Sequence, residues 1–220
     1  MKKRMDGAIM SGQIITIGRQ FGSGGREIGE TIARKLNIPC YDKELITMAA
    51  EQSGISQEVF EKADEKASNT FLYALLQASF PSTMQPMQVN DLPLNDKLYL
   101  IQFDIIKRVA KAGSCVIVGR CADHVLSEQK NVVKAFIHAP MIARLGRVMR
   151  VYSVDMKEAE EMINKNDKRR AKYYNYFTNN KWADMFNFDI CVNSAKVGVE
   201  GAADMIIDYA RRKEIEEKNG

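Results

Sequence analysis

Residues 14–29 read IITIGRQFGSGGREIG: a short apolar run, then a glycine-rich turn, then the start of an amphipathic helix. Glycines at positions 18, 22, 24 and 25 allow a sharp backbone turn and let its N–H groups approach an anion closely. The helix, expected to begin near Gly25 or Arg26, adds its positive dipole end. This stretch therefore predicts a loop that binds phosphate.

The loop departs from the G-x-x-x-x-G-K-[ST] signature of many nucleotide-binding loops. With Gly24 as the last loop glycine, Gly25 stands in place of the lysine. Arg26 and Glu27 follow where a magnesium-binding hydroxyl is expected. The stretch thus predicts a nucleotide phosphate site without the usual loop lysine.

Composition indicates a single soluble α/β domain with an inserted lid. The chain has 220 residues, of which 45% are hydrophobic and 27% charged, and its net charge is +4. This charge is too small to indicate binding to duplex nucleic acid, and no apolar run approaches the roughly 18 residues of a membrane span. Because Asp6 and Gln13 interrupt the region after the basic N-terminus, we expect no signal peptide and a cytoplasmic protein.

The cysteines lack the spacing of a metal site or a redox pair. They are Cys40, Cys115, Cys121 and Cys191. Three of them lie in or beside apolar runs, so we expect buried thiols. Only His124 and His138 are available as histidine ligands, which argues against zinc.

Five short apolar runs rich in β-branched residues alternate with helical patterns. The runs are residues 14–17, 38–41, 115–118, 132–137 and 189–192. Continuous runs of this kind are typical of parallel strands covered by helices on both faces. We therefore predict a three-layer α/β/α fold with a doubly wound, five-stranded parallel sheet. Apolar stripes at helical spacing within residues 28–36, 98–109 and 203–210 are expected to pack on it.

Ligands of such sheets bind beside the carboxyl ends of the strands. The predicted strand ends bring residues 18–26, Asp42, Arg120 and residues 138–140 around one crevice. These residues are the first candidates for a binding site.

Two segments are expected to extend this core. Residues 43–98 form a helical insert, in which the proline-rich residues 80–93 are expected to be a loop or flap. Residues 144–181 carry ten basic and five acidic side chains and form a basic lid that can close over phosphates. A solvated pair of charged helices explains the lid's charge equally well. We expect one domain over residues 13–213, between a leader (1–12) and a tail (214–220).

The order of these pieces resembles the cytidylate kinase-like family of P-loop kinases. The resemblance covers residues 14 to about 212 and rests on six motifs in the family's order. They are GRQFGSGGREIG (18–29), YDKEL (41–45), VIVGR (116–120), the helix with Arg144 and Arg147, NDKRR (166–170) and DICVNS (189–194). It implies a nucleoside monophosphate kinase-type P-loop fold with a helical lid, ATP and Mg²⁺ as cofactors, and small nucleotides as partners.

The resemblance also implies roles for the loop and the lid. Residues 22–26 would surround the donor phosphates, and Arg26, or else Arg19, would supply the charge of the missing lysine. Arg26 is favoured, because a cation in the first turn of a helix is unfavourable unless an anion lies nearby. The residues expected at ATP and its phosphates are Arg19, Phe21, Gly22, Ser23, Gly24, Gly25, Arg26, Glu27, Asn193 and Ser194. The expected catalytic cations are Arg26, Arg147, Arg169 and Arg170.

Two further residues match the family's acceptor site. Arg120 matches the arginine that holds the acceptor monophosphate, and Asp42 matches a turn whose carboxylate can accept from a sugar hydroxyl or a base amino group. Asp42 alternatively caps the following helix. The family's Asp-Gly-Arg-Asp at the third strand is Val-Gly-Arg-Cys here, so both acids are absent. Asp123 is a nearby substitute, or else it caps or solvates a helix.

Several aromatic residues could stack a base but are predicted to belong to the core, as aromatics at helical spacing usually do. They are Tyr173, Tyr174, Tyr176, Phe177 and Trp182. His138, at a strand end, is predicted to be structural.

The sequence supports an ATP-dependent phosphotransferase that acts on a nucleoside monophosphate or a similar small phosphorylated acceptor. A nucleotide-binding regulatory module with little transfer activity stays open, because the loop lysine, the hydroxyl and the strand-end acid are all replaced. A dinucleotide-dependent oxidoreductase fits less well, because Glu27 stands where its fingerprint needs a small residue. Monomer and homodimer both remain open.

Overall fold

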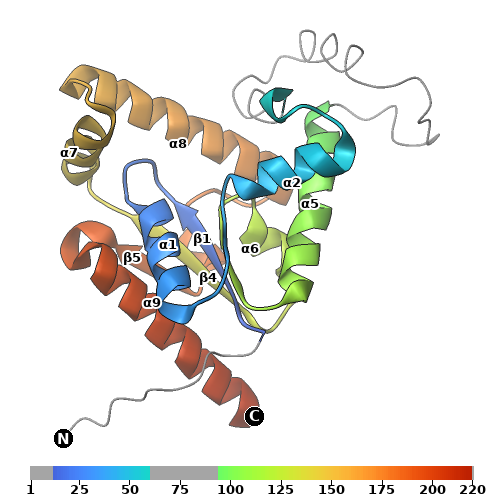
Figure 1. Ribbon diagram of the computed structural model, residues 1–220. Coiled ribbons are helices and arrows are strands. Elements are labelled where there is room, and N and C mark those ends of the chain that lie inside the picture. Colours follow the sequence, from blue (N-terminus) through green and yellow to red (C-terminus); the bar gives the residue numbers. More distant parts are fainter. Residues whose placement is uncertain (1–11, 60–93, 220) are drawn as a thin grey trace, which may run out of the picture.

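A parallel five-stranded sheet forms the centre of the protein (Figure 1). The computed structural model describes residues 12–59 and 94–219. The strands are β1 Ile14–Arg19, β2 Cys40–Tyr41, β3 Cys115–Val118, β4 Val132–His138 and β5 Ile190–Asn193. Their order is β2-β3-β1-β4-β5, and β1 pairs in parallel with both β3 and β4. The predicted doubly wound sheet is confirmed. The glycine-rich turn directly follows β1, the central strand.

Helices cover both faces of the sheet, as predicted. They are α1 Gly25–Leu36, α2 Glu44–Ser53, α5 Leu94–Ala112, α6 Ala122–Val125, α7 Met141–Tyr152, α8 Met156–Thr178 and α9 Ser194–Asn219, with a 3-10 turn η1 Met185–Asn187. Helices α1 and α9 pack on one face and α2, α5 and α6 on the other, while α7 and α8 cross the carboxyl ends of the strands (Figure 1). Among the described residues, none of the helices combines the length and apolar character that a membrane crossing requires.

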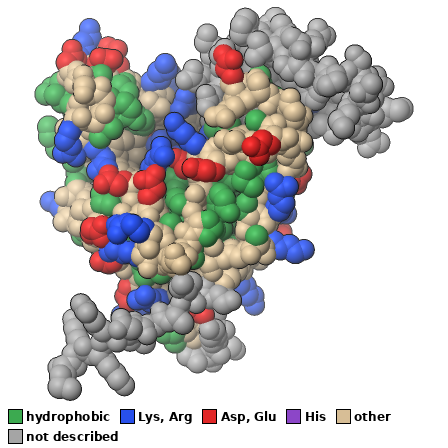
Figure 2. All heavy atoms as spheres, in the orientation of Figure 1, with side chains coloured by type: hydrophobic (Ala, Val, Ile, Leu, Met, Phe, Trp, Pro, Cys, Tyr) green, Lys and Arg blue, Asp and Glu red, His purple; other side chains and the backbone are tan. Residues whose placement is uncertain are grey.

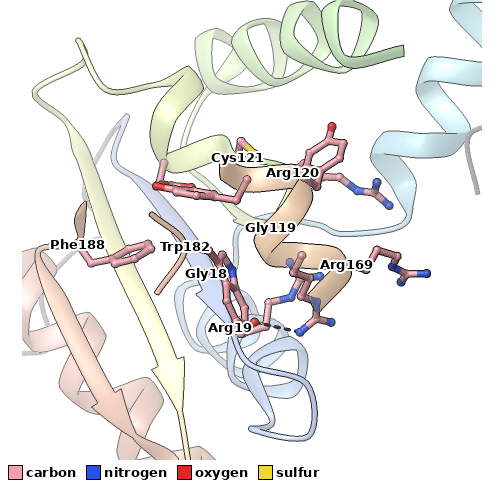
Figure 3. A pocket seen from close by; sticks show the side chains of 12 residues that line it. Gly18, Arg19, Gly119, Arg120, Cys121, Arg169, Trp182 and Phe188 are labelled. Carbon is pink, nitrogen blue, oxygen red and sulfur yellow. Dashed lines mark hydrogen bonds between the residues drawn. The ribbon is translucent and has the colours of Figure 1, made fainter. Parts of the chain in front are cut away.

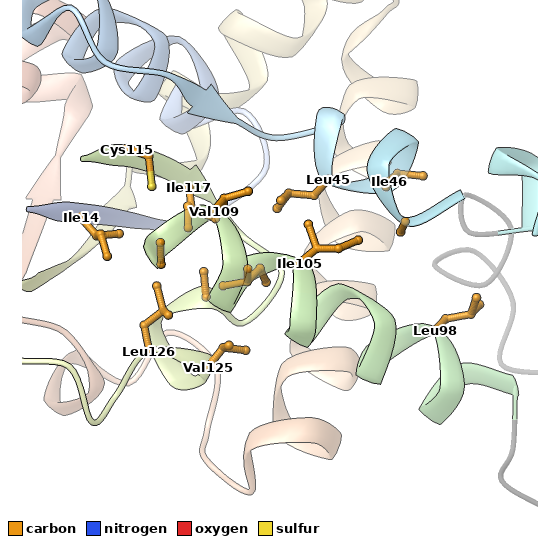
Figure 4. Close-up of a cluster of buried hydrophobic side chains, with 14 of the residues drawn as sticks. Ile14, Leu45, Ile46, Leu98, Ile105, Val109, Cys115, Ile117, Val125 and Leu126 are labelled. Atoms are coloured by element: carbon orange, nitrogen blue, oxygen red, sulfur yellow. The ribbon is translucent and has the colours of Figure 1, made fainter. Parts of the chain in front are cut away.

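Successive residues of β1 enter the two cores. Ile14 faces the core shared with α5 and α6, whereas Ile15 and Ile17 face the core shared with α1 and α9. All three are at most 1% exposed. Figure 4 shows the first core, where Ile105 and Val109 of α5 approach the sheet. Burial on both faces explains why the strands read as continuous apolar runs.

Several predicted boundaries differ from the structure, and β1 and β4 extend past their predicted ends to Arg19 and His138. The second strand begins at Cys40, because Asn37 turns left-handed (φ 52°) and the Ile38 N–H donates to the Ala33 carbonyl at 3.0 Å, which ends α1. Strand β5 begins and ends one residue later than predicted. Helix α9 continues through most of the expected tail. The predicted flap at 80–93 and most of the leader lie outside the described residues.

The burial prediction is wrong for two of the cysteines. Cys191 is exposed because β5 is an edge strand, and Cys40 is half-buried; Cys115 and Cys121 are buried as expected. Burial raises the pKa of Cys115 to about 12, so that thiol is protonated at neutral pH. Among the aromatics, Tyr176 is 67% exposed and is not a core residue.

Candidate active site

The turn between β1 and α1 has the geometry of an anion cradle. Its residues 20–24, the phosphate loop, contain Gly22 (φ +77°) and Gly24 (φ +82°) in left-handed conformations. A Cβ at Gly22 would lie 2.9 Å from Cγ2 of Val148, and one at Gly24 would lie 3.0 Å from the guanidinium carbon of Arg147. The loop leads into the first turn of α1, whose N–H groups have no helical carbonyl to bind. This arrangement suits a bound phosphate.

Hydrogen bonds from other strands hold the loop in this shape. The Gln20 N–H donates to the Ile137 carbonyl at 3.0 Å, and the Gln20 side-chain oxygen accepts from the Ala139 N–H at 3.1 Å. The Ser23 hydroxyl donates back to the Gln20 carbonyl at 2.9 Å. Ser194 donates to the Ser23 carbonyl at 2.6 Å. The hydroxyls of Ser23 and Ser194 therefore support the loop rather than face the cradle.

Arg19 runs across the carboxyl end of the central strand. Its Cβ lies 2.5 Å from the position of a Cβ on Gly25, and a Cβ on Gly119 would overlap its guanidinium. The guanidinium reaches Asp42 at 3.4 Å, and the side chain is only 18% exposed. Because Gly25 and Gly119 have no side chains, there is room for the Arg19 side chain between them.

Asp42 joins this arginine to a second one. Its other carboxylate oxygen is 3.5 Å from Arg26 Nε, which also donates to Glu30 at 2.8 Å. The Glu30 hydrogen bond raises the pKa of Arg26, whose side chain is 53% exposed. Asp42 does not cap α2: the cap position is Lys43, and the Asp42 N–H donates to Glu44. The capping alternative for Asp42 is therefore wrong.

The lid helices α7 and α8 bring three of the expected catalytic cations to the loop. Arg147 pairs with Glu27, and burial lowers the pKa of Arg147. Arg170 donates to the Arg19 carbonyl at 3.0 Å; burial, and next the charge of Arg19, lower the pKa of Arg170 to about 9, which leaves it a cation at pH 7. Arg169 donates to Asn166 at 3.2 Å.

Arg120 follows β3 in a left-handed turn. Gly119, Arg120 and Cys121 have φ angles of 76°, 59° and 54°. Non-glycine residues seldom take this conformation, and where they do the site is often functional. The turn carries Arg120 to the same crevice as Arg19.

Two neighbouring cavities open at this crevice. The larger, about 750 Å³, extends from the phosphate loop and α1 to α2 and the end of α7, and the smaller has about 130 Å³. In the space-filling view, Lys and Arg side chains gather with acidic ones around the hollow between α7 and α2 (Figure 2). Four arginines line both cavities: Arg19, Arg120, Arg169 and Arg170. Asn193, which accepts from the Ala195 N–H at 3.2 Å, and Ser194 line neither.

The smaller cavity has an aromatic side. Arg120 and Arg169 lie on one side of it and Phe188 on the other (Figure 3). Tyr173 and Trp182 also line it; both are partly buried, and their rings pack on other aromatic rings. Asp123 accepts from the Tyr174 hydroxyl at 2.7 Å and is 7% exposed, so it is neither a cap nor solvated. Burial raises the pKa of Asp123.

The chain matches the model of the cytidylate kinase-like family over residues 14–196. The protein belongs to this family. The crystal structure of an uncharacterized protein from Eubacterium ventriosum ATCC 27560 is 34% identical, with a TM-score of 0.66 over 90% of this chain and 98% of that one. A shikimate kinase from Bacteroides thetaiotaomicron shares the fold at 15% identity, with a TM-score of 0.50 over 94% of this chain and 99% of that one. No match is found among curated proteins.

The cytidylate kinase-like fold generally uses ATP and Mg²⁺, and the cradle fits a polyphosphate. Glycines stand where a Cβ would meet Val148 or Arg147 of the lid, and arginines line the cavities beside the cradle. Within the described ranges, no group of three His, Cys, Asp or Glu side chains could hold a metal ion. This donor set suits Mg²⁺ only if phosphate oxygens and water supply most of its ligands, as is common for this ion.

The role of Asp167 in this site was not predicted from the sequence. Asp167 of α8 accepts from the Phe21 N–H at 2.7 Å and from Arg144 at 2.5 Å. The amide of Phe21 is thereby bound to the lid and does not face the cradle. A signal was present, because Asp167 is the only acidic residue between Glu161 and Asp184 in a basic segment. An isolated acid among cations is expected to pair.

Proposed function

We propose that the protein is an ATP-dependent phosphotransferase that acts on a nucleoside monophosphate or a similar small phosphorylated acceptor in the cytoplasm. One observation carries the proposal: Arg19, Arg120, Arg169 and Arg170 line both of two adjoining cavities beside a phosphate loop. Phosphoryl transfer depends on positioned phosphates and neutralised charge more than on covalent catalysis. Cations shared by two cavities suit a group that passes from one ligand to another.

The donor phosphates would bind at the loop and the first turn of α1. Arg147, whose guanidinium lies against Gly24, would contact them from the lid. Arg19 is a better substitute for the loop lysine than Arg26, because it is mostly buried and lines both cavities, whereas Arg26 is half exposed and lines only the larger one. ATP supplies the phosphoryl group and Mg²⁺ reduces the repulsion between its phosphates.

The acceptor would bind between Asp42 and Arg120. An arginine fork suits the phosphate of a monophosphate, and Arg120 lies at the strand end where the family's acceptor arginine is found. Asp42, already between two arginines, would accept from a hydroxyl or amino group of the same acceptor.

A nucleotide-binding regulatory module is the second candidate. The observation that favours it is the pairing of candidate cations with carboxylates of the site itself, Arg147 with Glu27 and both Arg19 and Arg26 with Asp42. Such pairs reduce the positive charge available to a transferred phosphoryl group.

A two-step experiment separates these functions. Thermal shifts with a panel of nucleotides identify what binds, and mass spectrometry then follows phosphate transfer from ATP to each nucleoside monophosphate and to small phosphorylated acceptors. We expect stabilisation by ATP with Mg²⁺ and transfer to at least one acceptor. Binding without any transfer would support the regulatory module, and stabilisation by NADH alone would support an oxidoreductase.

A further inference from the structure

The phosphate loop contributes a side chain to the core of the lid. The ring of Phe21 packs against a cluster formed by Leu145 and Val148 of α7 with Ala159 and Ile163 of α8. It also stacks on Tyr152, with ring centroids 5.7 Å apart. Met149, Val154 and Met162 of the lid also pack against this cluster. Loop and lid therefore share one small hydrophobic core.

Buried polar groups join the same two parts. Asp167 uses one oxygen for the Phe21 N–H and the other for Arg144, which also donates to the Phe21 carbonyl at 3.4 Å. The side chains of Arg144 and Asp167 are only 8% and 17% exposed. A buried pair of this kind has a strict geometry, because loss of either partner leaves the other charge unpaired.

Contacts on either side of Phe21 extend the junction. Arg170 donates to the Arg19 carbonyl and lies 5.6 Å from the centre of the Phe21 ring. A Cβ on Gly22 would lie 3.1 Å from the Arg144 carbonyl oxygen, so a glycine here lets α7 approach the loop closely. Residues 19–22 thus contact both lid helices through backbone, ring and charge.

We propose that Phe21 and Asp167 are positioning residues that join the phosphate loop and the lid helices into one unit. The proposal rests on the proposed phosphotransferase function and adds to it how the lid arginines reach the phosphates. Arg169 and Arg170 lie on the same helix as Asp167 and are therefore set in place together with the loop. Phe21 acts through this packing and not by binding phosphate.

Hydrogen exchange of the nucleotide-free, full-length protein tests the joined unit without reference to activity. The double variant Arg144→Met/Asp167→Leu removes both buried charges at once, so neither is left unpaired. We expect peptides covering residues 20–26 and the start of α8 to exchange about tenfold faster together, while peptides of residues 14–19 and of β4 stay protected. Glu160→Gln, an exposed acid on the same helix, is the matched control and should match the wild type. Unchanged exchange of the loop in the double variant would overturn the proposal.

A pair of Phe21 variants tests the positioning role and stands in if the double variant does not fold. Phe21→Ser loses the packing, and Phe21→Leu keeps an apolar side chain there. We expect Phe21→Ser to lower kcat about 100-fold with little change in the KM of the acceptor, whose residues lie outside the unit, and Phe21→Leu to restore most of kcat. Equal kcat in both variants and the wild type would refute the role. If the wild type transfers phosphate to no acceptor, the proposed function fails, and loop exchange still decides whether the unit exists.

Discussion

The phosphate loop is held by hydrogen bonds from three distant segments, the end of β4, the start of α9 and the middle of α8. The turn between β2 and α2 is different, because the Asp42 carboxylate is held by two arginines at 3.4 and 3.5 Å, longer than a strong charge-assisted hydrogen bond. The loop bonds use groups that no ligand needs. The Asp42 pairs use cations that a phosphate would also bind.

This difference assigns separate tasks to the two sides. The loop keeps its shape before any ligand arrives, which limits the entropy lost on binding. At the turn, an anionic ligand competes with Asp42 for Arg19 and Arg26, so ligand binding rearranges charges there. Variants that alter either the loop or the Asp42 turn can test whether the two regions have separate tasks.

The largest effect is expected from Gly25→Ala, which would disturb the ligand-free shape of the phosphate loop. The new Cβ would lie 2.5 Å from the Cβ of Arg19, close to the backbone, so loop or strand must shift. We expect a loss of about 1–3 kcal/mol in the free energy of unfolding and a roughly 100-fold fall in transfer rate. Urea unfolding and steady-state kinetics measure these changes.

Gly146→Ala is the control for that variant. Gly146 lies on the exposed side of α7 with nothing within 4 Å of an added Cβ. It should stabilise the protein by about 0.5–1 kcal/mol, as alanine does in helices. Equal behaviour of the two variants would mean that the loop is not preset.

Next in size is the loss of single site arginines. We expect Arg19→Ala and Arg169→Ala each to lower kcat/KM by about 10- to 100-fold, because each removes a charge at the junction of the cavities. Arg26→Ala should cost less, since its side chain is half exposed. Arg34→Ala, an exposed arginine farther along α1 that pairs with Glu200, is the control. A larger loss in Arg26→Ala than in Arg19→Ala would return the role of the missing lysine to Arg26.

A smaller effect of opposite sign is expected from Glu27→Gln. The Glu27 carboxylate holds Arg147 beside the cradle, and its side chain is 56% exposed, so the pair is weak. Removing the charge should tighten ATP binding about two- to fivefold in calorimetric titrations. The gain should shrink at 0.5 M salt. Weaker binding would show instead that Glu27 assists the ligand, for example through a metal ion.

The smallest effect concerns Asp123 and depends on pH. Because burial raises its pKa in the folded protein, the native state holds this proton more tightly than the unfolded chain does. Stability from this group therefore falls as pH rises from the ordinary aspartate range through the raised pKa. Asp123→Asn keeps an acceptor for Tyr174 and should remove this loss, so its advantage in urea unfolding should be larger at pH 8 than at pH 5. An advantage independent of pH would contradict the assignment.

Local patterns made the strand, loop and helix at residues 14–36 predictable, because glycine spacing and helical periodicity act over few residues. The direction of a long side chain was not predictable in this way. Arg19 and Arg26 were both candidates for the missing cation, and their exposure depends on Gly119 and Asp42, which arrive from other segments. The sequence could name the arginines but could not rank them.

Contacts between residues far apart in the chain were also not predictable from the sequence. Asp167 binds an amide 146 residues earlier, and no periodicity encodes that contact. The exposure of Cys191 depends on the position of β5 at the sheet edge, which follows from strand order and not from its apolar neighbours. Tyr173 and Trp182 line a cavity whose other walls come from distant segments, among them Gly18 and Gly119.

The hydrogen bond from the Ser194 hydroxyl to the Ser23 carbonyl has a consequence for biosynthesis. Chains are made from the N-terminus, so the glycine-rich motif leaves the ribosome well before β4, α8 and the start of α9, all of which shape it. A nascent chain that stops before residue 194 carries the whole motif without the last of these bonds. Nucleotide binding should therefore appear late in translation, and a truncated product should not compete for the cell's nucleotides.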